Sequence, residues 1–107
     1  MPDDKKRIAH RALVDRVLTG AGRASPQQRA RAFGNAGLAA PLQTLIDKVA
    51  TAPSQVTDAD FAAVRAAGVT EDELFELVIC AAVGESTRQY EAGLAALAEA
   101  TVDREAG

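Results

Sequence analysis

Hydrophobic residues recur at helical spacing along most of this chain, and no stretch alternates between apolar and polar residues as a strand would. Leu42, Leu45, Ile46 and Val49 follow the i, i+3, i+4, i+7 rule of an amphipathic helix. Pro41 precedes this run and suits the opening of a helix. The pattern therefore predicts an all-helical protein.

Start and stop signals divide the chain into six predicted helices. A Ser, Thr or Asp followed by Gln or Glu three residues later caps a helix start, and a glycine commonly ends one. The predicted helices run from Asp3 or Asp4 to about Thr19 before Gly20, from Ser25–Pro26 with Gln28 to Gly34, from Pro41 to the break at 52–55, from Thr57 to Gly68, from Thr70 with Glu73 to Gly84, and from Ser86 with Gln89 onward.

The fifth of these helices is the most apolar, with two adjoining stripes on its surface. Apolar residues on most sides predict a helix buried among several others. In the sixth helix, Gly93 and the alanines around it predict close approach by a partner helix. The two stripes are Leu74, Leu77, Val78 and Ala81, and Phe75, Ile79 and Ala82.

Composition supports one all-α domain, a bundle of about six helices. The chain has 107 residues, enough for one modest core, and only 4% are aromatic, so aliphatic residues must build that core. The longest apolar run, Leu77–Val83, is far short of the roughly 20 residues that span a membrane. No apolar signal region follows the charged start, so we expect a cytoplasmic protein.

Charge is distributed unevenly. Residues 1–31 hold eight Lys and Arg against three Asp, a net charge of +5, whereas residues 32–107 carry a net charge of −8. We divide the chain into a basic helical segment (1–38), a helical core (39–102) and a frayed tail (103–107). A basic arm can meet nucleic acid, but the pI of 5.1 favours a solvated face or contact with the protein's own acidic body.

The stretch Val56–Ala100, and within it RAAGVTEDELFELVICAAVG, resembles the AhpD-like and carboxymuconolactone-decarboxylase-like family. The resemblance covers roughly Leu42–Ala100 and implies an all-helical, oligomeric protein. Several members of that family reduce disulfides through a Cys-x-x-Cys-x-x-x-His motif. Here the three motif positions fall near Pro53, Val56 and Asp60, which supply no thiol and no imidazole. The resemblance therefore implies a member without this redox activity.

Cys80, the only cysteine, is the first of the side chains with reactive potential. A single cysteine excludes a disulfide within the chain and a cysteine-cluster metal site. Helical phase places Cys80 on one face with Glu73 and Glu76, and nearby carboxylates oppose thiolate formation. We interpret it as a small, semi-buried apolar residue.

His10, Glu76 and Arg88 complete the set of candidates. His10 lies on the apolar face of the first helix with Leu13, Val14, Val17 and Leu18, either as a base in a pocket or as a core or interface histidine bonded to backbone. As the only histidine, it excludes a multi-histidine metal site within one subunit. Glu76 and Arg88, at the ends of neighbouring predicted helices, would form a buried pair that lines a cavity or, as we favour, a rim ion pair or two separately solvated side chains.

These observations favour a non-redox AhpD-like helical protein that acts by oligomeric assembly or by binding a partner or small molecule. We expect a homo-oligomer, no cofactor, no metal and no membrane contact. An enzyme of the decarboxylase or peroxidase type that uses an interface cavity is the main alternative. A weak nucleic-acid-binding module that uses the basic N-terminal segment is the third.

Overall fold

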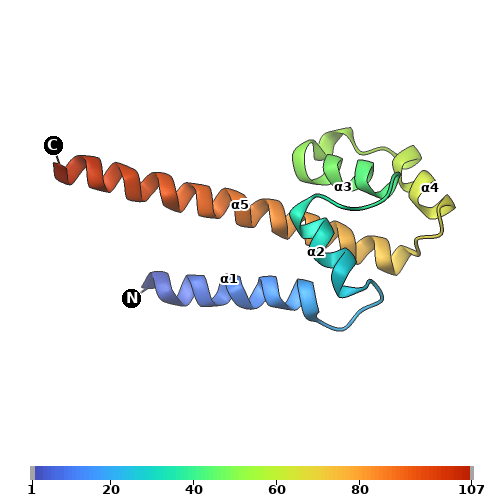
Figure 1. Cartoon of the computed structure of the whole chain (residues 1–107), viewed down its shortest axis with the longest axis horizontal. Helices are drawn as coiled ribbons and strands as arrows, with labels where there is room; N and C mark the ends of the chain where they lie inside the picture. The colour runs from blue at the N-terminus through green and yellow to red at the C-terminus, as the bar shows by residue number, and fades with distance from the viewer. Residues whose placement is uncertain (1, 107) are drawn as a thin grey trace.

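The computed structural model describes residues 2–106, with side chains described for residues 4–102. Over this range the chain is all-helical and contains no strand. Five α-helices and one 3₁₀ turn follow one another (Figure 1). They are α1 (Pro2–Thr19), α2 (Pro26–Gly34), α3 (Leu42–Thr51), η1 (Pro53–Gln55), α4 (Asp58–Ala66) and α5 (Glu71–Ala106).

Helix α5 organises the molecule. Helices α2 and α3 pack against its N-terminal half, and α4 packs against α3 at the same end. Helix α1 runs beside α5 in the opposite direction, so that both chain termini lie at the end away from α3 and α4 (Figure 1). The result is an elongated shape with extents of 58 × 29 × 20 Å.

The prediction of two helices separated at Gly84 is wrong, because one helix of 36 residues runs through this position. A helix-ending glycine adopts a positive φ, as Gly68 does after α4, but Gly84 does not. The glycine is required by tertiary packing instead. A Cβ atom at Gly84 would collide with the backbone carbonyl of Phe33, so the end of α2 lies directly on α5 here.

The close approach of a partner helix that we predicted at Gly93 does not occur within the described part of one chain, and approach by a second copy stays a prediction. A Cβ atom added there would meet no heavy atom within 4 Å. The glycine that permits close helix packing is thus the one that the sequence pattern assigned as a stop.

Most of the predicted caps are confirmed. The Ser25 hydroxyl accepts a hydrogen bond from the Gln28 amide at 3.1 Å. Thr57 forms a reciprocal capping box with Asp60, and Thr70 forms one with Glu73. The cap predicted at Asp3 or Asp4 is wrong, because α1 already begins at Pro2 and both residues lie inside it.

The core lies where α2, α3 and α4 meet the N-terminal half of α5. Its most buried large side chains, each less than 2% exposed, are Leu45, Ile46, Val64, Leu77 and Cys80. The first predicted stripe of the 71–83 segment faces this core, since Leu74 and Ala81 are buried as well.

The second stripe is not buried, contrary to our prediction. Phe75 is 67% exposed, and Ile79 and Ala82 are exposed too. Neighbouring helices cover only one side of α5, so the opposite side faces solvent. The aromatic residues lie outside the most buried part of the core as well: Phe33 is half-buried, and Phe61, Phe75 and Tyr90 are exposed.

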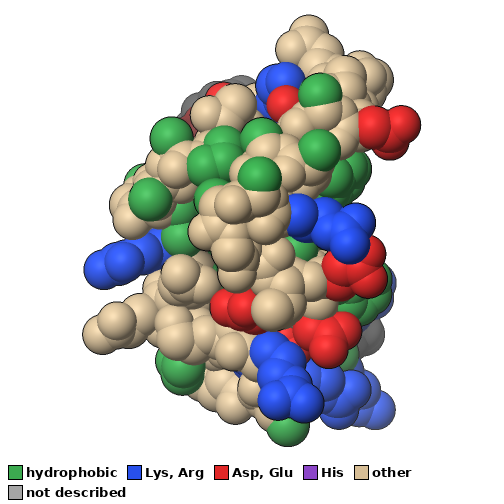
Figure 2. Space-filling view, turned by 90° about the vertical axis from the view of Figure 1, so that its right-hand side faces the viewer, with side chains coloured by type: hydrophobic (Ala, Val, Ile, Leu, Met, Phe, Trp, Pro, Cys, Tyr) green, Lys and Arg blue, Asp and Glu red, His purple; other side chains and the backbone are tan. Residues whose placement is uncertain are grey.

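The surface has apolar and charged regions at different places. On the end that carries α3 and α4, apolar side chains gather in the upper part of the view, while basic and acidic side chains alternate below them (Figure 2). Leu13 of α1 is exposed, whereas Val14, Val17 and Leu18 are half-buried. Among the helices of residues 2–106, none combines the length and apolar character needed to cross a membrane.

The frayed tail predicted at 103–107 stays a prediction. The side chains of these residues, and Gly107 altogether, lie outside the described part of the chain.

Two glycine-to-alanine substitutions in α5 should have opposite effects. We expect Gly84→Ala to lower the free energy of unfolding by about 1–3 kcal/mol, because the new methyl group pushes α2 away. Gly93→Ala should raise it by up to about 1 kcal/mol through helix propensity alone. Urea unfolding followed by circular dichroism measures both; equal effects would contradict the packing at Gly84.

Candidate functional site

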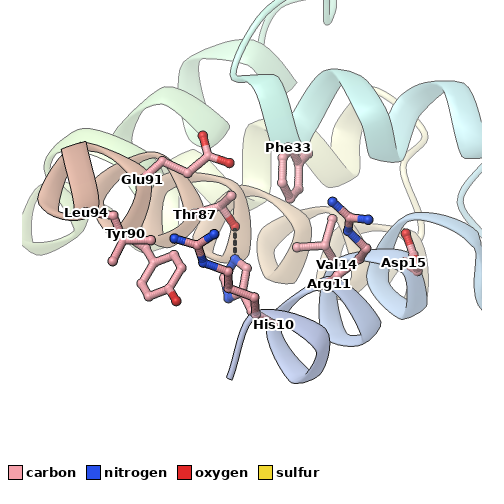
Figure 3. Close-up of a pocket in the computed structure, with 10 residues that line it drawn as sticks. His10, Arg11, Val14, Asp15, Phe33, Thr87, Tyr90, Glu91 and Leu94 are labelled. Atoms are coloured by element: carbon pink, nitrogen blue, oxygen red, sulfur yellow. Dashed lines mark hydrogen bonds between the residues drawn. The ribbon is translucent and has the colours of Figure 1, made fainter. Parts of the chain in front are cut away.

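A groove lies between α1 and α5. Its volume is about 490 Å³. The side chains of α1 form one wall, those of α5 form the other, and the end of α2 closes the groove through Phe33 (Figure 3). The lining residues are Arg7, His10, Arg11, Val14, Asp15, Phe33, Thr87, Tyr90, Glu91 and Leu94.

His10 joins the two walls of this groove. Its Nε2 atom lies 2.9 Å from the Thr87 hydroxyl oxygen, and its ring stacks on Tyr90 with centroids 5.0 Å apart and 27° between the planes (Figure 3). The Thr87 hydroxyl donates its single proton to the carbonyl oxygen of Val83 at 2.7 Å. The hydroxyl oxygen therefore accepts from His10, which fixes the donor hydrogen on Nε2.

The sequence placed His10 correctly on the inward side of α1 but did not identify its partners. We expected a backbone partner, whereas the structure gives a side-chain hydroxyl, and His10 is half-buried. Thr87 and Tyr90 were not selected as functional residues. They share a helical face three residues apart, but the predicted helix break at Gly84 separated them from the rest of α5.

Charged side chains of both signs line the groove. Arg7 and Arg11 come from α1, Asp15 also comes from α1, and Glu91 comes from α5. Within residues 4–102, neither arginine forms an ion pair or side-chain hydrogen bond. The groove thus offers cations, carboxylates and an apolar wall together.

Glu76 holds the loop between α1 and α2. Its carboxylate accepts hydrogen bonds from the amide of Arg23 at 2.8 and 3.0 Å and from that of Ala24 at 2.6 Å. The Arg29 guanidinium lies 3.5 Å away. The amides of Ala24 and Arg23, and then Arg29, hold the pKa of Glu76 below its ordinary value of 4.5.

Arg29 completes this arrangement from α2. The residue is only 4% exposed, and its Nη1 atom donates to the carbonyl oxygen of Gly20 at 2.5 Å. A Cβ atom at Gly22 would meet the ends of the Arg29 and Glu76 side chains, so a larger residue here would displace these two groups. Sequence analysis missed Arg29, since no local signal distinguishes it from the other arginines of the basic segment.

Cys80 lies near Arg29 and Glu76, and its surroundings do not activate the thiol. It is fully buried, and its thiol donates to the carbonyl oxygen of Val17 at 3.2 Å. Burial raises the pKa of the Cys80 thiol; Arg29 acts in the opposite direction and Glu76 in the same one. The thiol therefore stays protonated and shielded, which is unfavourable for a nucleophile or redox group.

Glu76 and Arg88 do not pair, so the cavity pair and the rim ion pair are both wrong, and the two side chains have separate partners. Both residues belong to α5, and twelve residues of helix separate their backbones by about 18 Å. Arg88 donates instead to the carboxylate of Glu85 at 3.0 Å and to the carbonyl oxygen of Phe33 at 2.7 Å. It thus caps the C-terminal end of α2.

Side chains of residues 4–102 include no group of three His, Cys, Asp or Glu that could hold a metal ion. No family model, curated protein or solved structure was found that matches this chain.

Acid should destabilise the protein partly through Glu76. Its folded-state pKa is lowered, so its contribution is complete above about pH 4.5 and is lost as the pH falls toward the folded value. We expect Glu76→Gln to cost about 1–2 kcal/mol at pH 7 and to reduce the loss of stability between pH 5 and 3. Unfolding midpoints of both proteins, measured between pH 7 and pH 3, test this prediction.

The exposed Glu99→Gln, on the same helix, is the control and should leave the pH profile unchanged. The pKa of Asp60 is also lowered, chiefly by its hydrogen bond with Lys48, so Asp60 contributes to the acid dependence as well and part of the slope will persist. A Glu76→Gln profile that matches the unsubstituted protein would contradict the role of the Glu76 carboxylate.

Proposed function

We propose that this protein is a self-associating helical module that acts by assembly, without redox chemistry. The observation that carries the proposal is the C-terminal half of α5, which α1 flanks on one side and whose other sides are open. From Arg88 to Val102 every side chain is exposed except that of Leu94, and Leu97 and Val102 are more than 60% exposed.

The dimensions of the single chain agree with a helix whose surface is only partly packed by the rest of the chain. The radius of gyration is 16.7 Å, whereas a compact chain of this length has one of about 13 Å. Isolated helices are marginally stable in water, and most helical stability in proteins comes from packing an apolar face. A second copy would supply that packing for the distal half of α5.

The AhpD-like relationship belongs to this proposal as well. The helix caps at Thr57 and Thr70, on which the resemblance partly rests, are formed. At the positions of the family's redox motif, Pro53 begins η1 and Asp60 serves the Thr57 cap and an ion pair with Lys48 at 2.9 Å. These residues have structural roles, which supports a non-redox member.

A second candidate function is the binding of a small molecule in the α1–α5 groove. Its volume of about 490 Å³ is within the roughly 300–1,000 Å³ of ligand sites. Arg7 and Arg11 face no partner side chain within residues 4–102, and Asp15 and Glu91 balance their charge. A ligand of mixed polarity with an apolar portion would fit this lining.

Tyrosine fluorescence offers a direct test of the second candidate. Tyr90 is the only tyrosine and the chain has no tryptophan, so its emission reports on the groove alone. We expect small amphipathic acids or amino acids to change the emission saturably, and His10→Ala to weaken that binding at least about tenfold. A flat response across such a panel, or binding indifferent to His10, would exclude the groove as their site.

Self-association predicts a mass that rises with concentration. Analytical ultracentrifugation should give a weight-average mass above the 11.1 kDa of one chain at about 100 µM and a decrease on dilution. A constant mass of one chain at 0.5 mM would contradict the proposed function.

A further inference from the structure

One side of α5 carries an exposed seam with regular spacing. Its eight positions are separated by alternating steps of four and three residues, which keeps them on one side of a helix. Every one of them is exposed. The seam consists of Phe75, Ile79, Ala82, Ser86, Gln89, Gly93, Ala96 and Ala100.

The seam is free of charge and graded in size. Its N-terminal end holds the two bulky residues, Phe75 and Ile79, and its C-terminal end holds Gly93, Ala96 and Ala100. None of the eight seam residues would carry a charge out of water when another helix packs on the seam.

The spacing of the seam reads the same in both directions about the midpoint between residues 86 and 89. A second copy laid antiparallel about that point would place each large residue of one helix against a small residue of the other. The pairs would be Phe75 with Ala100, Ile79 with Ala96, Ala82 with Gly93 and Ser86 with Gln89. A parallel pair would instead oppose Phe75 to Phe75 and leave a gap at Gly93.

The area of the seam indicates how strongly two copies should associate. Its 25 residue steps extend about 38 Å along the helix, and at a width of about 10 Å the strip covers about 380 Å² per copy. Two such strips fall below the 1,200–2,000 Å² of standard stable interfaces, at the weak end of the scale. The association should therefore be reversible and concentration-dependent.

We propose that two copies of this chain pair through the α5 seam, antiparallel about a two-fold axis that passes between residues 86 and 89. The partner is a second copy of the chain, and the inference rests on the self-association proposed above. The groove that contains His10 lies on a different side of α5 and stays open in this arrangement.

Mixed cysteine cross-linking tests the direction and register. In a Cys80→Ala background, one variant carries Ala82→Cys and another Gly93→Cys, and the two are mixed in equal amounts under mild oxidation. We expect the disulfide-linked product to be chiefly the mixed dimer, because residue 82 of one copy faces residue 93 of the other. Dominant homodimers of each variant would indicate parallel pairing and overturn the inference.

A matched pair of substitutions at exposed positions tests which face of α5 forms the dimer contact. Ala96 lies in the seam, whereas Ala98, two residues on and equally exposed, lies on another side of α5. Ala96→Glu should weaken the dimer at least about tenfold in sedimentation equilibrium, because it buries a charge, and Ala98→Glu should leave it unchanged. Circular dichroism confirms that both variants stay helical.

The outcomes separate this inference from the function on which it rests. If the unsubstituted chain stays monomeric at 0.5 mM, the proposed function fails and the seam fails with it. If it associates but Ala98→Glu weakens it as much as Ala96→Glu, the seam is wrong and self-association stands.

Discussion

The close contact between the end of α2 and Gly84 determines how the rest of the structure is arranged. Because Gly84 has no side chain, the carbonyl of Phe33 can lie against the backbone of α5. Arg88, one turn further on, donates to that same carbonyl at 2.7 Å. The contact therefore fixes α2 near the middle of α5, leaves α3 and α4 toward the N-terminal half, and leaves the C-terminal half with α1 as its neighbour on one side.

Glu76 complements this contact by holding the other end of α2. Its carboxylate binds two backbone amides of the α1–α2 loop and the buried Arg29, so α1 must turn back along α5. The direction of α1 in turn brings His10 to Thr87 and forms the groove. The Glu76 carboxylate and Gly84 thus position both walls of the candidate site.

The sequence predicted what depends on neighbours along the chain and missed what depends on contacts across it. The caps at Ser25, Thr57 and Thr70 involve residues three apart, so the local sequence was sufficient to predict them. Gly84 is locally indistinguishable from a helix stop, since its purpose is contact with α2. The partners of His10 and Glu76 lie 47 or more residues away in sequence, and a local sequence pattern carries no information about contacts over that separation.

The distribution of reactive groups favours assembly over catalysis. The Glu76 carboxylate is engaged by the loop, Asp60 by its cap and Lys48, and the Cys80 thiol is buried with a raised pKa. Of the candidate residues, His10 alone both lines the groove and retains a ring nitrogen outside its bond to Thr87. A single imidazole can assist binding, but general acid–base catalysis and nucleophilic catalysis usually require a second positioned group. The extended, uncharged and exposed side of α5 would by contrast need only a second copy for the self-pairing that we propose.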